Sequence, residues 1–161
     1  MSSEKIKKYK YAQLTDDAKI TARECIDRNG GDIREIDILD KAMNGVDYVF
    51  HLAAMWLLHC KDFPRTAFDV NIAGTFNVFE ACVKHNVKKL IYSSSSSVYG
   101  DTNKHPIYEH NELNPKNIYA ITKKNNEEHA EIYSKIYGLS IIGLRFFTVF
   151  GEWGRPDMLI L

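Results

Sequence analysis

The sequence predicts an α/β fold built on a doubly wound parallel sheet, and two observations support this class. Runs of apolar, strand-forming residues at 47–52, 89–92 and 139–144 alternate with longer stretches of helical periodicity, which is typical of a parallel sheet with helical crossovers. Polar residues also follow the strands, among them the serines 93–97 and Thr148. Since ligands bind at the carboxyl ends of the strands in such sheets, we expect a binding site there.

The composition indicates one soluble globular domain. The chain has 161 residues, of which 45% are apolar and 26% are charged, as is ordinary for globular proteins. Its 21 basic and 21 acidic residues balance, so no surface for nucleic acid or for an anionic membrane is expected. No apolar run approaches the roughly 18 residues of a membrane span, and the polar N-terminus has no signal-peptide core.

The cysteines predict reduced thiols and a cytoplasmic location. Cys25, Cys60 and Cys82 are odd in number and widely spaced, which matches neither a disulfide framework nor a metal site. The six histidines have no ligand-like spacing either. We therefore assign no metal.

The first half of the chain predicts two helices and a buried strand. A helical pattern covers 16–28, and a short helix at 38–44 ends at Gly45. The continuous apolar run 47–52 suits a parallel strand that is covered on both faces.

Two longer helices follow. One begins at about Asp62, with Pro64 in its first turn. The other begins at Asn114 and Pro115, which offer an N-cap and a first-turn proline, and it runs to about Tyr137.

Tyr119 and Lys123 are the candidate catalytic pair. They lie four residues apart, so in a helix they share one face. A free tyrosine has a pKa of about 10, and a nearby ammonium lowers it by stabilising the phenolate. The pair would then act as a general base toward a hydroxyl group. Alone, this spacing is a weak motif, since surface helices carry it often.

Asn71 and the serine run have both structural and functional interpretations. Asn71 lies on a helix face of mostly small residues, where a buried amide needs hydrogen-bond partners. It is interpreted as a structural amide that ties two loops together, which is compatible with a functional role. The serines 93–97 would suit a low-complexity linker, but a linker does not normally separate a strand from the apolar Val98-Tyr99.

Six motifs occur in one order along residues 30–158. They are Gly31-Asp32-Ile33-Arg34, Val49-Phe50-His51-Leu52-Ala53-Ala54, Asn71 with Gly74-Thr75, Ser93 to Gly100, Tyr119 to Lys123, and Leu144-Arg145-Phe146-Phe147. In this combination the chain resembles the extended short-chain dehydrogenase/reductase family, specifically its nucleotide-sugar epimerases and dehydratases. The ending, 144–158, looks most like the UDP-glucuronate 4-epimerase branch. The resemblance implies a Rossmann-like fold, NAD as cofactor, a UDP-sugar substrate and a homodimer.

The chain also departs from the family pattern at its beginning. No glycine precedes Gly30, so the glycine-rich turn that holds the cofactor pyrophosphate in the family is missing. The acidic residue that selects NAD and the C-terminal substrate region are missing too. We therefore expect 1–161 to be a single, partial NAD(P)-binding domain, incomplete at the N-terminus, with a divergent segment at 1–29.

The resemblance implies roles for individual residues. Tyr119 takes the proton from the sugar 4-hydroxyl while C4 gives hydride to NAD, Lys123 lowers the pKa of Tyr119, and Ser95 shares the proton. The implied cofactor-binding residues are Asp32, Ile33, Leu52, Ala53, Ala54, Asn71, Ser93, Tyr119, Lys123 and Phe146. The implied substrate-binding residues are Ser95, Ser96, Ser97, Thr148 and Arg155.

Three functional interpretations remain open at this point. Dehydratases of the family place Asp-Glu after the catalytic serine, and Ser96 and Ser97 do not titrate near neutral pH. An epimerase is therefore favoured over a nucleotide-sugar dehydratase. A truncated, non-catalytic domain is the alternative from another class. Arg155 is either a surface loop residue or the partner of a uronic acid carboxylate.

Overall fold

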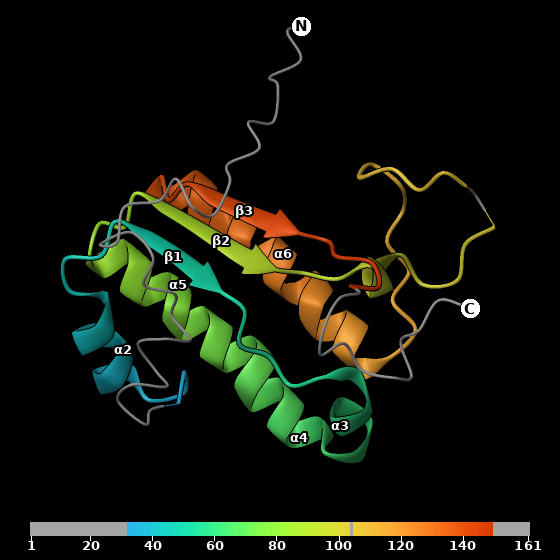
Figure 1. Cartoon of the computed structure of the whole chain (residues 1–161), viewed down its shortest axis with the longest axis horizontal. Coiled ribbons are helices and arrows are strands. Elements are labelled where there is room, and N and C mark those ends of the chain that lie inside the picture. The colour runs from blue at the N-terminus through green and yellow to red at the C-terminus, as the bar shows by residue number, and fades with distance from the viewer. Residues whose placement is uncertain (1–31, 104, 150–161) are drawn as a thin grey trace, which may run out of the picture.

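The computed structural model describes residues 32–103 and 105–149. Three strands of this part form one parallel sheet, in the order β1-β2-β3 (Figure 1). They are β1 (Tyr48–His51), β2 (Lys89–Ser93) and β3 (Ile141–Leu144). The predicted α/β class with a parallel sheet is confirmed. β3 begins at Ile141 rather than at Leu139, because pairing with β2 starts with the Leu90 amide donating to the Ser140 carbonyl.

The connection from β1 to β2 consists of several helical segments rather than one helix from Asp62. Phe63 has a non-helical backbone (φ −129°, ψ 66°) that separates two short helices, and Pro64 takes the first-turn position predicted for it. The segments are α3 (Leu57–Asp62), α4 (Pro64–Ala67), the π-helical turn η3 (Phe68–Gly74) and α5 (Thr75–Lys84). Asn71 lies in η3, where the wider helical turn faces the interior.

Helix α6 (Ile118–Tyr137) connects β2 to β3 and carries the candidate catalytic pair. The predicted N-cap, Asn114, is wrong. Asn117 is the cap, because its backbone is extended and its side chain accepts a hydrogen bond from the Ala120 amide at 2.8 Å. The predicted end is confirmed: Gly138 adopts φ +68°, a left-handed conformation that suits glycine at a helix terminus.

Helix α2 (Ile36–Met43) precedes β1 and begins two positions before the predicted Ile38. Gly45 follows it with φ +75°, so glycine serves the chain reversal there. The predicted helix at 16–28 lies outside the described residues.

The hydrophobic core lies between the sheet and the helices α5 and α6, which pack side by side on one of its faces (Figure 1). Val49, Leu90 and Tyr92 point into this core and are buried. On the opposite face Phe50 and Ile91 are half-buried and Ile142 is 42% exposed. The described residues therefore cover one face of the sheet, whereas the sequence predicted cover on both.

Candidate active site

A cavity of about 700 Å³ opens at the carboxyl ends of the strands, where the sequence predicted a binding site. It brings together the predicted catalytic residues Ser95 and Tyr119, the predicted substrate residues Ser96, Ser97 and Thr148, and the predicted cofactor residues Ser93 and Phe146. Five further residues that sequence reasoning missed complete the lining: Trp56, Leu57, Ser94, Phe147 and Val149.

Ser95 is held at the start of a 3₁₀ turn, η4 (Ser96–Tyr99). Its hydroxyl accepts a hydrogen bond from the Ser97 amide at 3.2 Å and lies 3.1 Å from the Ser97 hydroxyl. Gly100 ends the turn at φ +64° and ψ −151°, a region that is essentially confined to glycine. A Cβ at this position would lie 2.0 Å from the Asn114 carbonyl oxygen. The serine run is thus a fixed loop and not a linker.

Lys123 is buried beneath this loop, and its ammonium points at the end of β2. The Nζ donates to the Ser93 carbonyl at 2.7 Å and lies 3.5 Å from the Ser93 hydroxyl. Burial lowers the pKa of Lys123 to about 8. The same Nζ lies 5.7 Å from the centre of the Tyr119 ring, so the predicted shared helix face is confirmed.

The pKa of Tyr119 does not follow the sequence prediction. Burial raises it above the ordinary tyrosine value, and a hydrogen bond with Ser95 offsets part of that rise. The Lys123 ammonium donates to the Ser93 carbonyl. The hydrogen bond with Ser95 is the interaction that favours the Tyr119 phenolate.

A charged network fastens the serine loop to α6 and to the segment after β3. Arg145 donates two hydrogen bonds to Glu127, at 2.9 and 2.8 Å, and one to the Tyr99 hydroxyl at 2.8 Å. Ser94 donates to the same Glu127 carboxylate. The Ser94 and Ser96 amides continue the pairing beyond the strands by donating to the carbonyls of residues 144 and 146. The serine loop and the segment after β3 are thereby tied to α6.

Asn71 is fully buried and connects three segments around the site. Its Oδ1 accepts from the Met55 amide at 2.6 Å, and its Nδ2 lies 3.1 Å from both the Met55 carbonyl and the Thr122 hydroxyl. Asn126 donates to the Asn71 carbonyl at 2.8 Å. The predicted structural role is confirmed, since the amide ties the loop after β1 to α6. Its predicted contact with a cofactor stays a prediction.

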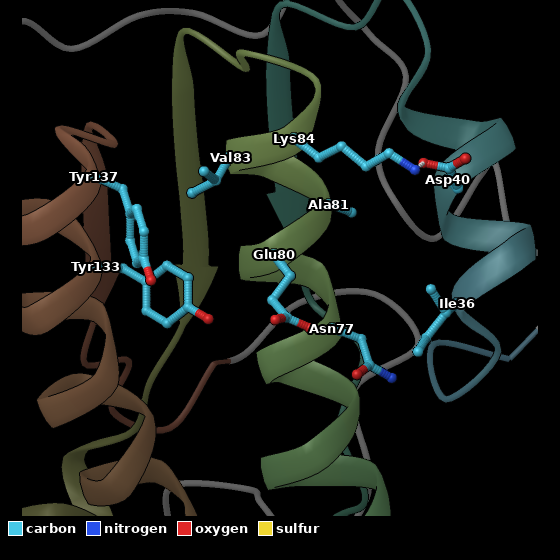
Figure 2. Close-up of a pocket in the computed structure, with 9 residues that line it drawn as sticks. All are labelled: Ile36, Asp40, Asn77, Glu80, Ala81, Val83, Lys84, Tyr133 and Tyr137. Atoms are coloured by element: carbon cyan, nitrogen blue, oxygen red, sulfur yellow. Dashed lines mark ion pairs between the residues drawn. The ribbon is translucent and has the colours of Figure 1, made fainter.

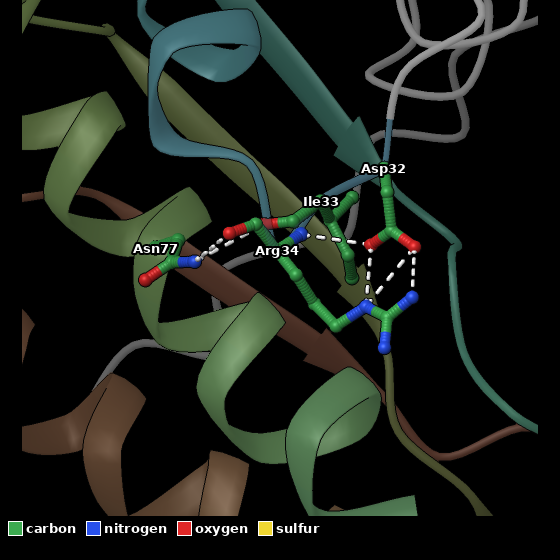
Figure 3. A network of polar contacts seen from close by, with 4 residues as sticks. All are labelled: Asp32, Ile33, Arg34 and Asn77. Carbon is green, nitrogen blue, oxygen red and sulfur yellow. Dashed lines mark hydrogen bonds and ion pairs between the residues drawn. The ribbon is translucent and has the colours of Figure 1, made fainter. Parts of the chain in front are cut away.

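Asp32 and Ile33 lie at a second place, in the turn before α2 (Figure 3). Both carboxylate oxygens of Asp32 accept from the Arg34 side chain, at distances of 2.6 to 3.0 Å, and the Asp32 pKa is lowered mainly by that hydrogen bonding. The Ile33 side chain is 3% exposed and packs in the core. Asn77 donates to the Ile33 carbonyl at 3.2 Å. Only the backbone of Ile33 is therefore available to a ligand.

The other predicted site residues differ in position. Leu52 and Ala54 are exposed and Ala53 is half-buried, all in the loop that follows β1. Arg155 lies outside the described residues.

A separate cavity of about 380 Å³ lies between α2, α5 and α6 and contains none of the predicted site residues (Figure 2). The Lys84 ammonium forms an ion pair with Asp40 at its edge, at 2.6 Å, and Tyr133 and Tyr137 point into it from α6.

No helix among residues 32–103 and 105–149 is long and apolar enough to cross a membrane. The same part of the chain has no group of three His, Cys, Asp or Glu residues suited to a metal ion.

A family comparison decides how this site should be interpreted. The model of the NAD dependent epimerase/dehydratase family matches residues 4–160. The chain belongs to this family. Within it, UDP-glucuronate 4-epimerase 4 of Arabidopsis thaliana is 42% identical over 150 residues, which cover 87% of this chain and 34% of that protein. The Staphylococcus aureus protein CapI is 50% identical over 96 residues, or 59% of this chain and 29% of its own length.

Solved structures of the epimerase/dehydratase family share the fold. A UDP-N-acetylglucosamine 4-epimerase of Methanobrevibacter ruminantium, in complex with UDP-N-acetylmuramic acid, matches with a TM-score of 0.74 at 34% identity, over 80% of this chain and 43% of that one. A Brucella ovis UDP-glucose 4-epimerase in complex with NAD matches with a TM-score of 0.70 at 31% identity, over 73% and 37%. These matches confirm the predicted Rossmann-like class. The chain spans about a third of the length of the curated relatives.

The described residues of this family member offer polar groups suited to a dinucleotide at two places. The Lys123 ammonium has three donors and hydrogen-bonds to the two oxygens of Ser93, so a third donor suits a ribose hydroxyl. The Asp32 carboxylate lies in the turn before α2, where both of its oxygens accept from Arg34. The glycine-rich pyrophosphate turn has no counterpart in the sequence before Gly30.

Proposed function

We propose that this chain carries the catalytic centre of an NAD-dependent nucleotide-sugar 4-epimerase that acts on UDP-glucuronate or UDP-glucose. One observation carries the proposal: Ser95 and Tyr119 line one cavity at the carboxyl ends of the strands, and the Lys123 ammonium lies behind the Tyr119 ring. These are the groups that remove a proton from a secondary alcohol. The named relatives support the substrate class, since several are UDP-glucuronate 4-epimerases.

The proposed mechanism assigns one task to each residue. When bound, NAD supplies the acceptor for the hydride that leaves C4 of the sugar. Tyr119 takes the proton of the 4-hydroxyl on its phenolate oxygen and returns it after the sugar has turned over. Ser95 hydrogen-bonds to the phenol and stabilises its anion. Lys123 holds the ribose and places a positive charge behind the Tyr119 ring.

The residues after Ser95 favour epimerisation over dehydration. Elimination of water requires an acid and a base in addition to the tyrosine. Ser96 and Ser97 line the cavity at this place, and a serine hydroxyl does not titrate near neutral pH. These two serines therefore do not supply the second acid–base pair that a dehydratase requires.

The uronic acid assignment rests on the segment after β3. Thr148 lines the cavity, and we propose that its hydroxyl and those of Ser96 and Ser97 bind a C6 carboxylate together with Arg155. In an enzyme of full family length, Arg155→Leu should weaken UDP-glucuronate binding by about 1.5–3 kcal/mol, the worth of a charged hydrogen bond. UDP-glucose binding should hardly change, and an equal loss for both sugars would make Arg155 a structural residue.

A non-catalytic domain is the second candidate, favoured by the absence of a glycine before Gly30. Without backbone donors at a pyrophosphate, NAD loses several hydrogen bonds to charged oxygens, each worth about 1.5–3 kcal/mol. We therefore expect this chain alone to bind NAD weakly or not at all. Calorimetry that gives a low-micromolar dissociation constant would refute that expectation.

We further propose a cytoplasmic homodimer. Cys60 and Cys82 are buried free thiols, which suits a reducing compartment. Helix α6 exposes a row of isoleucines at positions 121, 132 and 136, which are 50% to 66% exposed, and such apolar surface favours association. Light scattering after gel filtration should give twice the chain mass. A monomeric mass would refute the dimer.

The function itself is tested in a protein of full family length. Residues 32–149 replace the matching segment of the Arabidopsis thaliana UDP-glucuronate 4-epimerase 4, and the product formed from UDP-glucuronate is identified by proton NMR. The proposal predicts the C4 epimer. A 4-keto-6-deoxy product from UDP-glucose would instead identify a dehydratase.

A further inference from the structure

The lining of the active-site cavity combines two kinds of side chain. The serine loop and Tyr119 supply hydroxyls. Trp56 and Leu57, at the start of α3, and Phe147 and Val149, from the segment after β3, supply apolar surface. A hexose ring has the complementary distribution, since its hydroxyls project from the rim and its C–H bonds cover the faces.

The structure holds the Trp56 side chain in place at the cavity. The preceding residue, Met55, is fixed on both sides of its backbone, because the buried Asn71 amide binds its N–H at 2.6 Å and its carbonyl at 3.1 Å. The Cys60 thiol donates to the same carbonyl at 3.3 Å. The indole packs edge-on against His59, with ring centres 4.9 Å apart at 61°. Trp56 remains 37% exposed, so a held aromatic face borders the cavity.

We infer that Trp56 is a specificity-determining residue, whose indole packs against the C–H face of the sugar ring while the serine loop binds its hydroxyls. The inference rests on the proposed function, because it takes a UDP-hexose as the ligand. Burying the apolar face of a sugar on a held aromatic ring removes both from water. The contact costs little ordering, since Asn71 fixes the backbone of the preceding Met55 and His59 packs against the indole.

An apolar contact also suits a reaction that interconverts two epimers. A hydrogen bond to the 4-hydroxyl would favour either its equatorial or its axial position. Apolar packing is non-directional, so Trp56 retains the ring while C4 changes configuration. The contact therefore binds both sugars and distinguishes a pyranose from a ligand without such a face.

The test uses the two tryptophans of the sequence, Trp56 and Trp153. In a Trp153→Phe protein labelled with 5-fluorotryptophan, Trp56 gives the single fluorine NMR signal. We expect UDP-glucose and UDP-glucuronate to shift this signal saturably, and UDP to leave it unchanged. Saturation-transfer NMR on the sugar protons then gives dissociation constants for the variants.

The variants separate packing from folding. Trp56→Ala should raise the dissociation constant of both UDP-sugars about tenfold, as expected when roughly 55 Å² of apolar contact is lost, while Trp56→Phe should raise it less. Leu58→Ala is the matched control, because Leu58 is 48% exposed beside the same loop and does not line the cavity. Its dissociation constants should equal those of the wild type, and circular dichroism should show that all variants are folded.

Three results would overturn the inference. If UDP shifts the fluorine signal as far as the UDP-sugars do, the nucleotide and not the sugar contacts Trp56. If the UDP-sugars bind but the signal stays in place, Trp56 has no part in binding and the proposed function is unaffected. If no UDP-sugar binds to the protein of full family length either, the substrate class fails as well. Conversely, a sugar-dependent shift without epimer formation in the full-length protein would support the role of Trp56 in sugar binding and refute the epimerase function.

Discussion

Replacing Asn71 should destabilise the protein more than replacing any comparable surface amide. Asn71→Ala removes three side-chain hydrogen bonds to nitrogen and oxygen, at the Met55 amide, the Met55 carbonyl and the Thr122 hydroxyl, at 2.6, 3.1 and 3.1 Å, and a weaker one to the Cys60 sulfur at 3.5 Å. The site is fully buried, so water does not replace them without opening the packing. At about 1 kcal/mol for each net hydrogen bond, the free energy of unfolding should fall by about 3 kcal/mol.

Asn77→Ala is the matched control for this change. Asn77 lies two turns further along the same helical stretch, is half-buried, and donates to the carbonyls of Ile33 and Arg34 at 3.2 and 3.4 Å. Water can take its place, so we expect a loss below about 1 kcal/mol.

Urea denaturation followed by circular dichroism measures both losses. A free energy of unfolding for Asn71→Ala within about 0.5 kcal/mol of the Asn77→Ala value would show that the buried amide does not hold the loop. Asn71→Asp keeps the acceptor for Met55 but loses the donors and buries a charge, so it should be no more stable than Asn71→Ala at pH 7.

Three further predictions concern the same site. Arg145→Lys loses the two-pronged contact with Glu127 and should lower the free energy of unfolding by about 1.5–3 kcal/mol in urea titrations; an unchanged value would refute a structural role. Gly100→Ala forces a strained backbone and a contact with the Asn114 carbonyl, so a loss of about 2 kcal/mol or more is expected in the same assay, and a loss under 0.5, roughly the noise of surface changes, would contradict it. The folded-state pKa of Lys123, about 8, lies below its ordinary value of 10.5, so the unfolded chain binds more protons between these pH values. The free energy of unfolding of the wild type, relative to Lys123→Met, should therefore rise from pH 8 to 10.5. Parallel pH profiles of the two unfolding free energies would show that the Lys123 pKa is not lowered on folding.

The sequence was sufficient to predict the strands and the position of the site at their carboxyl ends. The runs that became β1 and β2 consist of strand-forming residues, and a parallel sheet puts the ends of its strands at one edge. It was insufficient for the start of α6. Asn114-Pro115 and Asn117 both carry capping signals. Which of them begins the helix depends on tertiary structure, because the backbone N–H of Asn114 donates to the Val98 carbonyl in the folded chain.

Two features of the site depend on tertiary structure and were therefore missed or misjudged. The spacing of Tyr119 and Lys123 gives a common helix face, but it does not show that the ammonium reaches the Ser93 carbonyl. Trp56 lies outside the sequence motifs, and Phe147 belongs to a motif that gave it no role; only the fold places both on one cavity. A polar amide such as Asn71 in a small-residue face was the one signal that pointed to the loop carrying Trp56.

The central claim is that Tyr119 is the base of a 4-epimerase, and one comparison tests it directly. In the full-length protein that contains residues 32–149, proton NMR follows conversion of UDP-glucuronate to its C4 epimer with Tyr119 intact and with Tyr119→Phe. Removal of the acid–base group predicts a rate at least 10²-fold lower for Tyr119→Phe, the lower end of the typical contribution of general base catalysis, with NAD affinity nearly unchanged. Equal rates, or a folded, NAD-binding parent that forms no epimer, would contradict the account.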